Sequence, residues 1–141
     1  MIRLRNVSRG TVRSREIIDA YKKAFHFAWW YPKKPFYLAD EFYKETDQTF
    51  IQDILAKDKT NLETYVTEFF DCDDYAFRLM GIFHQNGEVA AMPIFITWVL
   101  TSFGGHAVLS YYKSGEIYII EPQNDNIYSV PKNWKLLLLC G

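Results

Sequence analysis

The hydrophobic pattern of the chain changes at Gly87, and this change limits the fold more than any other feature of the sequence. Before Gly87, apolar residues recur at intervals of three and four, which is the spacing of one face of a helix. After Gly87, β-branched and aromatic residues form short runs between turn residues, which is typical of strands. A chain of 141 residues has room for one domain with a hydrophobic core. The order therefore predicts helices first and a sheet afterwards.

Three helices are predicted before the change of pattern. They are expected from Ser14 to a point before Pro32, over residues 47–57 with Thr46 or Asp47 as the cap, and from about Asp71 to Phe83. The aromatic segment 29–37 lies between the first two helices and contains two prolines. Because proline interrupts both helices and central strands, this segment is predicted to be an extended ordered loop.

Strands are predicted after the change of pattern, over residues 89–92, 94–100, 106–112, 116–121, 126–130 and 134–139. Two of them flank the short turn from Lys113 to Gly115, so they should pair as a hairpin. Helices followed by several such strands indicate an α+β fold, with N-terminal helices packed on a C-terminal antiparallel sheet.

The charge distribution and the length of the apolar runs bear on the partners of the protein and on its cellular compartment. Nine of the 16 basic residues fall within residues 1–34, where there are only two acidic residues, so a nucleic-acid contact through this segment is one hypothesis. No known nucleic-acid motif follows it.

The most apolar stretch, residues 89–103, is too short for a membrane span and contains Pro93, and no signal peptide is recognisable. With only two cysteines, a disulfide scaffold is excluded, and a cytoplasmic protein without a membrane partner is expected.

Three residues form the main candidate site. Cys72 falls in the first turn of the third predicted helix, where free backbone N–H groups and the helix dipole favour a thiolate. His106 follows two glycines at the start of a strand, and Glu121 ends the next strand at the same end of the predicted hairpin. A carboxylate beside a histidine fixes its tautomer, so the three residues are predicted to form a Cys-His-Glu triad.

The acidic residues beside Cys72 predict that a cation is bound next to the thiol. Asp73 and Asp74 oppose a nearby thiolate and should raise the pKa of the cysteine. A hard divalent ion held by Asp73 or Asp74 together with side-chain oxygens of the loop Gln123-Asn124-Asp125 would neutralise them, and Gln123 and Asn124 are the expected ligands from that loop. Ligation by oxygen alone suits calcium.

The motifs Asp71 to Phe77, Gly105 to Val108 and Ile120 to Asp125 together resemble a known family. They are similar to the papain-like cysteine peptidase domain of the fairy-ring mushroom agglutinin and to its short bacterial and phage relatives. The resemblance covers residues 65–125, and residues 1–60, the basic helical part, are matched poorly. It implies a single papain-like domain over residues 1–141, and no lectin module.

The resemblance also implies an activity. In that family the matching residues make Cys72 the nucleophile, His106 the general base and Glu121 the orienting carboxylate of a calcium-dependent cysteine peptidase. Calcium, or another divalent cation, is the implied cofactor, and a peptide or protein is the implied substrate. A phage-encoded protein in the host cytoplasm is a further expectation.

Several alternatives stay open at this point. The same triad could serve a transglutaminase-like acyl transferase or a deamidase, and a non-catalytic interaction protein of phage type could keep the fold. An oxyanion donor beyond the Cys72 N–H is not determined, with Asn61, Tyr65 and Trp29 or Trp30 as candidates. The sequence does not indicate the oligomeric state.

Overall fold

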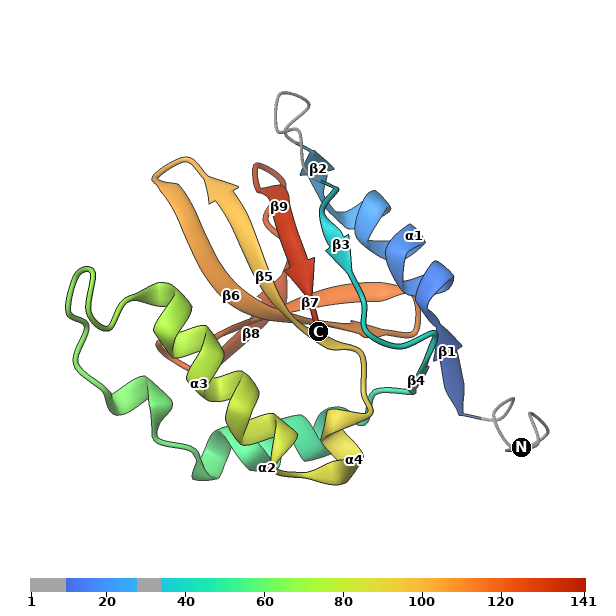
Figure 1. Ribbon diagram of the computed structural model, residues 1–141, viewed down its shortest axis with the longest axis horizontal. Helices are drawn as coiled ribbons and strands as arrows, with labels where there is room; N and C mark the ends of the chain where they lie inside the picture. The colour runs from blue at the N-terminus through green and yellow to red at the C-terminus, as the bar shows by residue number, and fades with distance from the viewer. Residues whose placement is uncertain (1–9, 28–33) are drawn as a thin grey trace.

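The computed structural model describes residues 10–27 and 34–141, and its centre is a seven-stranded sheet (Figure 1). The main path of the sheet follows the order β2, β9, β5, β6, β7, β8, and β3 also pairs with β9. The strands are β2 (His26–Phe27), β3 (Phe36–Tyr37), β5 (Ile94–Thr101), β6 (Gly104–Lys113), β7 (Glu116–Glu121), β8 (Asn126–Ser129) and β9 (Lys135–Cys140). A separate two-stranded sheet joins β1 (Thr11–Arg13) to β4 (Phe42–Lys44).

Short helices cover both faces of the large sheet (Figure 1). They are α1 (Ser14–Ala24), α2 (Gln48–Lys57), the 3-10 helix η2 (Thr60–Leu62), α3 (Cys72–His84) and α4 (Gly87–Ala90). Side chains of α1 pack with Phe95 and Val108, whereas those of α2 and α3 pack with Ile94 and Leu109. Because neighbouring residues of a strand point to opposite faces, the central strands are apolar on both sides. One sheet therefore carries two hydrophobic cores.

Two of the three helix predictions are confirmed almost to the residue. Asp47 caps α2, and its side chain accepts a hydrogen bond from the backbone N–H of Thr49. Asp71 is the residue before α3, and the Asp74 carboxylate accepts a hydrogen bond from the Asp71 N–H at 3.2 Å. These acids satisfy backbone donors that the first turn of a helix leaves free.

The strand predictions after residue 93 are also confirmed. The hairpin of β6 and β7 has the expected turn, and β8 and β9 continue the sheet on either side of the predicted pairs. Residues 89–92 are not a strand, because Asn86 accepts hydrogen bonds from the N–H groups of Glu88 and Val89 and so caps α4. A local cap thus starts a short helix where hydrophobicity predicted a strand.

The predicted fold class, α+β with papain-like N-terminal helices packed on a C-terminal antiparallel sheet, is wrong. The molecule is mostly sheet, its helices are short, and they lie on both faces. The sheet also takes strands from the N-terminal part, since β2 and β3 pair in parallel with β9. The backbone carbonyl groups of residues 35–37 hold β3 against β9. The Leu139 N–H donates to Pro35 O at 2.6 Å, and the Gly141 N–H donates to Tyr37 O at 3.1 Å.

In the described ranges, no helix combines the length and the apolar character that a membrane crossing requires. The first predicted helix ends at Ala24, earlier than expected, and the chain then enters β2. Residues 28–33, which hold most of the predicted aromatic loop, lie outside the described residues.

Candidate functional site

The imidazole of His106 and the carboxylate of Glu121 form a pair at the end of the sheet. His106 Nε2 lies 2.7 Å from Glu121 Oε2, and the two side chains are 24% and 12% exposed. Because an ionised carboxylate only accepts hydrogen bonds, Nε2 carries the proton. The other carboxylate oxygen, Oε1, accepts a bond from the backbone N–H of Gln123 at 3.3 Å. The glutamate therefore fixes both the histidine tautomer and the turn that follows β7.

An aromatic ring lies against the histidine of this pair. The Trp134 ring meets the His106 ring edge to face, with centroids 6.2 Å apart, and Tyr128 meets Trp134 at 6.0 Å. Burial, together with the charge of Glu121, raises the pKa of Tyr128 to about 12. The phenol thus stays neutral beside the carboxylate.

Cys72 begins α3 and approaches β6 at the residue after His106. Its thiol is partly buried and packs against the core between α3 and the sheet. Burial raises the pKa of the thiol, and the Asp71 and Asp73 carboxylates raise it further, whereas the backbone N–H groups of Ala107 and Asp73 lower it. The balance leaves the pKa above its ordinary value, so the thiol stays protonated at neutral pH.

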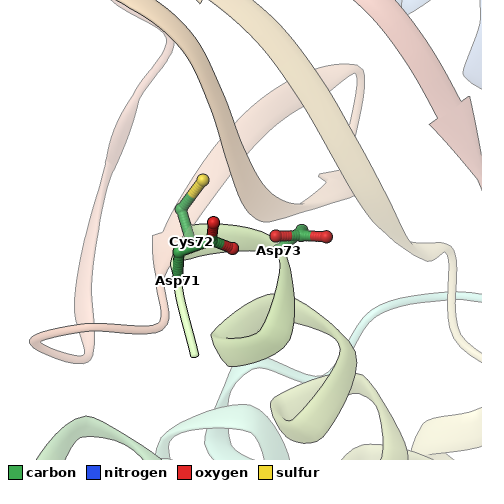
Figure 2. A group of neighbouring side chains, drawn as sticks. All are labelled: Asp71, Cys72 and Asp73. Atoms are coloured by element: carbon green, nitrogen blue, oxygen red, sulfur yellow. The ribbon is translucent and has the colours of Figure 1, made fainter. Parts of the chain in front are cut away.

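Asp71, directly before α3, and Asp73, in its first turn, flank Cys72 (Figure 2). Each of the three side chains has one potential metal-ligand atom, sulfur or carboxylate oxygen, and these three atoms lie within 4.8 Å of one another. A side-chain hydrogen bond in which protonated Asp73 donates to the Asp71 carboxylate, followed by burial and the charge of Asp71, raises the pKa of Asp73. Two carboxyl groups this close favour a shared proton or a bound cation.

The structure joins two of the three predicted triad residues by a hydrogen bond, and the third lies on the adjoining element. Within residues 10–27 and 34–141, no hydrogen bond connects the Cys72 thiol to His106. The contact of the thiol with Ala107 nevertheless places it at the strand position next to the imidazole. The assignment of Cys72, His106 and Glu121 to one site stays a prediction.

The four predicted metal ligands lie in two local turns. The Asp74 carboxylate accepts from the Asp71 N–H, and Asn124 Oδ1 accepts from the Asn126 N–H at 2.9 Å. Asp73 is grouped with Asp71 and Cys72, as described above, and Gln123 contacts Glu121 through its backbone. The oxygens of Asp74 and Asn124 thus stabilise their own turns, and the four-residue calcium site stays a prediction.

Some residues at the site carried no usable sequence signal. The Ala107 N–H is a backbone group, and Trp134 precedes β9, which β5 separates from the β6 strand of His106. Asp71 was expected only as a helix cap, although the run Asp71-Cys72-Asp73-Asp74 is itself a concentration of ligand atoms. Among the expected oxyanion donors, Trp29 and Trp30 fall outside the described residues, and Tyr65 is half-exposed.

The basic N-terminal segment is described only in part. Arg13 lies over the Phe42 ring, 5.2 Å from its centroid, which is a cation–π contact within the protein. Arg3, Arg5 and Arg9 lie outside the described residues. A nucleic-acid contact through this segment stays a prediction.

The fold defines the chain as a domain of mixed sheet, with helices on both faces and a polar site where α3 meets β6. Several solved structures share this fold, and two of them are similar over nearly the whole chain. One is described as the PSL1a–E64 complex; it has a TM-score of 0.79 and 18% identity, and the match covers 94% of this chain and 51% of that one. The other is a Polyporus squamosus lectin bound to the influenza-binding epitope Neu5Aca2-6Galb1-4GlcNAc, with a TM-score of 0.72, 18% identity, and 94% and 50% covered.

The chain spans about half the length of each of these proteins, and at this identity the likeness shows the fold alone. The expected likeness to a mushroom lectin is confirmed at the level of the fold. No family model matches the chain, and no curated protein matches it.

These comparisons contradict the predicted function. The chain shares its fold with a glycan-binding lectin, and no peptidase family model matches it, so the prediction of a calcium-dependent cysteine peptidase is wrong. The alternatives that assumed the same papain-like fold, acyl transfer and deamidation by the triad and a non-catalytic phage-type protein, are corrected with it. So is the predicted peptide or protein substrate, because the ligand named for the lectin is a glycan.

Proposed function

We propose that the chain is a ligand-binding domain whose binding site is the Cys72 thiol together with the His106–Glu121 pair. The observation that carries this proposal is the position of the thiol, which contacts the Ala107 N–H directly after the paired His106. The proposed role is binding of a ligand at the thiol, not turnover. The proton on Nε2 is held by Glu121, which leaves Nδ1 of His106 as the ring nitrogen able to accept the thiol proton.

We further propose that calcium, or another divalent cation, controls this thiol. The acidic first turn of α3 opposes a negative charge on sulfur, and a cation held there would remove that opposition. Asp73 and Asp74 are the proposed ligands from α3, and Gln123 and Asn124 are those from the turn after β7. In this proposal the cation turns a protonated thiol into a thiolate.

Alkylation of the two cysteines tests this proposal. Iodoacetamide should label Cys72 several-fold faster in calcium than in chelator, as measured by mass spectrometry of the peptides over time. The labelled peptide that disappears in the Cys72→Ala variant is the one that carries Cys72. Cys140 is the internal control, because burial alone raises the pKa of its thiol and its labelling should not respond to calcium.

The Asp73→Asn variant gives the matching test of the electrostatics. Removing this charge lowers the pKa of Cys72, so in chelator the labelling rate should begin to rise at a lower pH than in the wild type. E64, named for one comparison structure, is a second reagent for the same site. Equal labelling of Cys72 with and without calcium, at a rate matching that of Cys140, would contradict the proposal.

A second candidate function is glycan binding, favoured by the Trp134 ring beside the His106–Glu121 pair. An aromatic ring next to a carboxylate offers an apolar face and hydrogen-bond acceptors to a sugar. Calorimetric titration with Neu5Aca2-6Galb1-4GlcNAc should show binding that Trp134→Ala abolishes and that the exposed control Phe103→Ala retains. Absence of heat with the wild type would exclude this epitope as the ligand.

A further inference from the structure

Two aromatic rings meet on the α3 side of the sheet, close to Cys72. The Phe77 ring of α3 contacts the Trp98 ring of β5 edge to face, with centroids 5.8 Å apart and the ring planes at 63°. Phe77 is 52% exposed, and Trp98 is partly buried against the α3 core. An aromatic ring that stays half in water offers apolar surface to a ligand.

The register of the strands connects this pair to the thiol. Trp98 lies opposite Ala107 on β6 and opposite Leu138 on β9. Because directly opposed residues of neighbouring strands point to the same face, their three side chains form one apolar row on the α3 side. The Cys72 thiol lies at the Ala107 end of the row, where it contacts the Ala107 N–H. The row extends away from the sulfur for about 10 Å, which is two strand spacings.

The far end of the row keeps part of its surface in water. Leu138 and Trp98 are both partly buried, and Phe77 lies against Trp98 from α3. Figure 1 shows β5 between β6 and β9, so the row runs across the three central strands. Asp73 comes four residues before Phe77 and lies on the same side of α3, where its carboxylate opposes an anionic ligand. The surface therefore favours an uncharged apolar group.

We propose that Phe77, Trp98 and Leu138 form a subsite for an uncharged, flat apolar group of a ligand bound at Cys72. This inference rests on the proposed function, since it takes the thiol as the point of binding, and it adds the chemical class of the group held beside the thiol. Such a ligand carries a thiol-binding group and, within about 10 Å of it, an aromatic or similarly flat group. The two rings contact that group, and Leu138 closes the end of the row.

Two maleimides that differ in one substituent test the subsite. N-phenylmaleimide carries its ring about one strand spacing from the carbon that sulfur attacks, and N-ethylmaleimide lacks the ring. The ratio of their rate constants, phenyl over ethyl, should be about three- to tenfold higher at Cys72 than at glutathione. Mass spectrometry of the Cys72 peptide over time measures both rates. Because both reagents meet the same thiol, its pKa and the presence of calcium cancel in the ratio.

Variants of Phe77 locate the preference. Phe77→Ala should lower the ratio at Cys72 to that of glutathione, and Phe77→Tyr, which keeps the ring, should retain it. The matched control is Phe50→Ala, at a 41% exposed phenylalanine of α2, which should leave the ratio unchanged. Because Phe77 is half-exposed and alanine favours a helix, Phe77→Ala should keep its fold, which its melting temperature checks.

The outcomes separate this inference from the proposed function. A ratio at Cys72 equal to that of glutathione, or one that Phe77→Ala leaves unchanged, overturns the subsite. Loss of the calcium response with the ratio retained contradicts the proposed control by calcium and supports the subsite. A Cys72 thiol that reacts with neither maleimide overturns both.

Discussion

Glu121 shows how a single residue can hold several parts of the candidate site. One carboxylate oxygen accepts from His106 and the other from the Gln123 N–H, while the charge of the group helps to raise the pKa of Tyr128. The side chain is only 12% exposed, so water replaces these bonds poorly. Its removal would leave polar groups of two segments without partners.

Replacing Glu121 with alanine should lower the free energy of unfolding by about 1 to 3 kcal/mol, because the imidazole and the Gln123 N–H lose their acceptor. Urea denaturation at neutral pH measures the change. The matched control is Glu116→Ala, at the exposed start of the same strand, which should change stability by less than about 0.5 kcal/mol. A loss for Glu121→Ala no larger than that of the control would show that the pair contributes nothing to folding.

At the scale of elements, a buried polar contact joins helix α1 to the sheet. The Tyr21 hydroxyl lies 2.6 Å from Ser110 Oγ on β6, and Ser110 Oγ lies 2.6 Å from Thr97 Oγ1 on β5. All three residues are buried. Because a hydroxyl both donates and accepts, the chain of three can satisfy each member. It fixes the position of α1 along the strands more narrowly than apolar packing alone would do.

The Tyr21→Phe variant should therefore lower the free energy of unfolding by about 1 kcal/mol, because the ring stays and one buried hydrogen bond is lost. Thermal and urea unfolding provide the measurement. Tyr37→Phe removes a hydroxyl from a tyrosine that is 61% exposed and serves as the control. Equal stabilities of the two variants would mean that the contact does not anchor the helix.

At the scale of the whole molecule, one sheet separates two hydrophobic cores. The α3 side contains Leu79 and Phe83, and the α1 side contains Ile17 and Tyr21. The central strands contribute alternate residues to each core, so neither core can form without the sheet. The candidate site lies where the α3 core reaches β6, and its two polar turns, at the start of α3 and after β7, come from segments far apart in the chain.

Local sequence determined much of the secondary structure. Caps and apolar periodicity placed α2 and α3, and the turn around Gly115 placed the hairpin of β6 and β7. The pairing of His106 with Glu121 also followed from the sequence, since a short turn sets the register of two adjacent strands. These features depend on residues close together in the chain.

Only the tertiary structure decided the fold class and the position of Cys72 beside β6. The backbone of residues 35–37 pairs with β9, roughly a hundred residues away, and no side-chain pattern reports such a backbone contact. In the same way, Cys72 comes to the strand position next to His106 only because α3 packs on β6. Burial and long-range proximity set the energies of these groups, and both are properties of the folded chain.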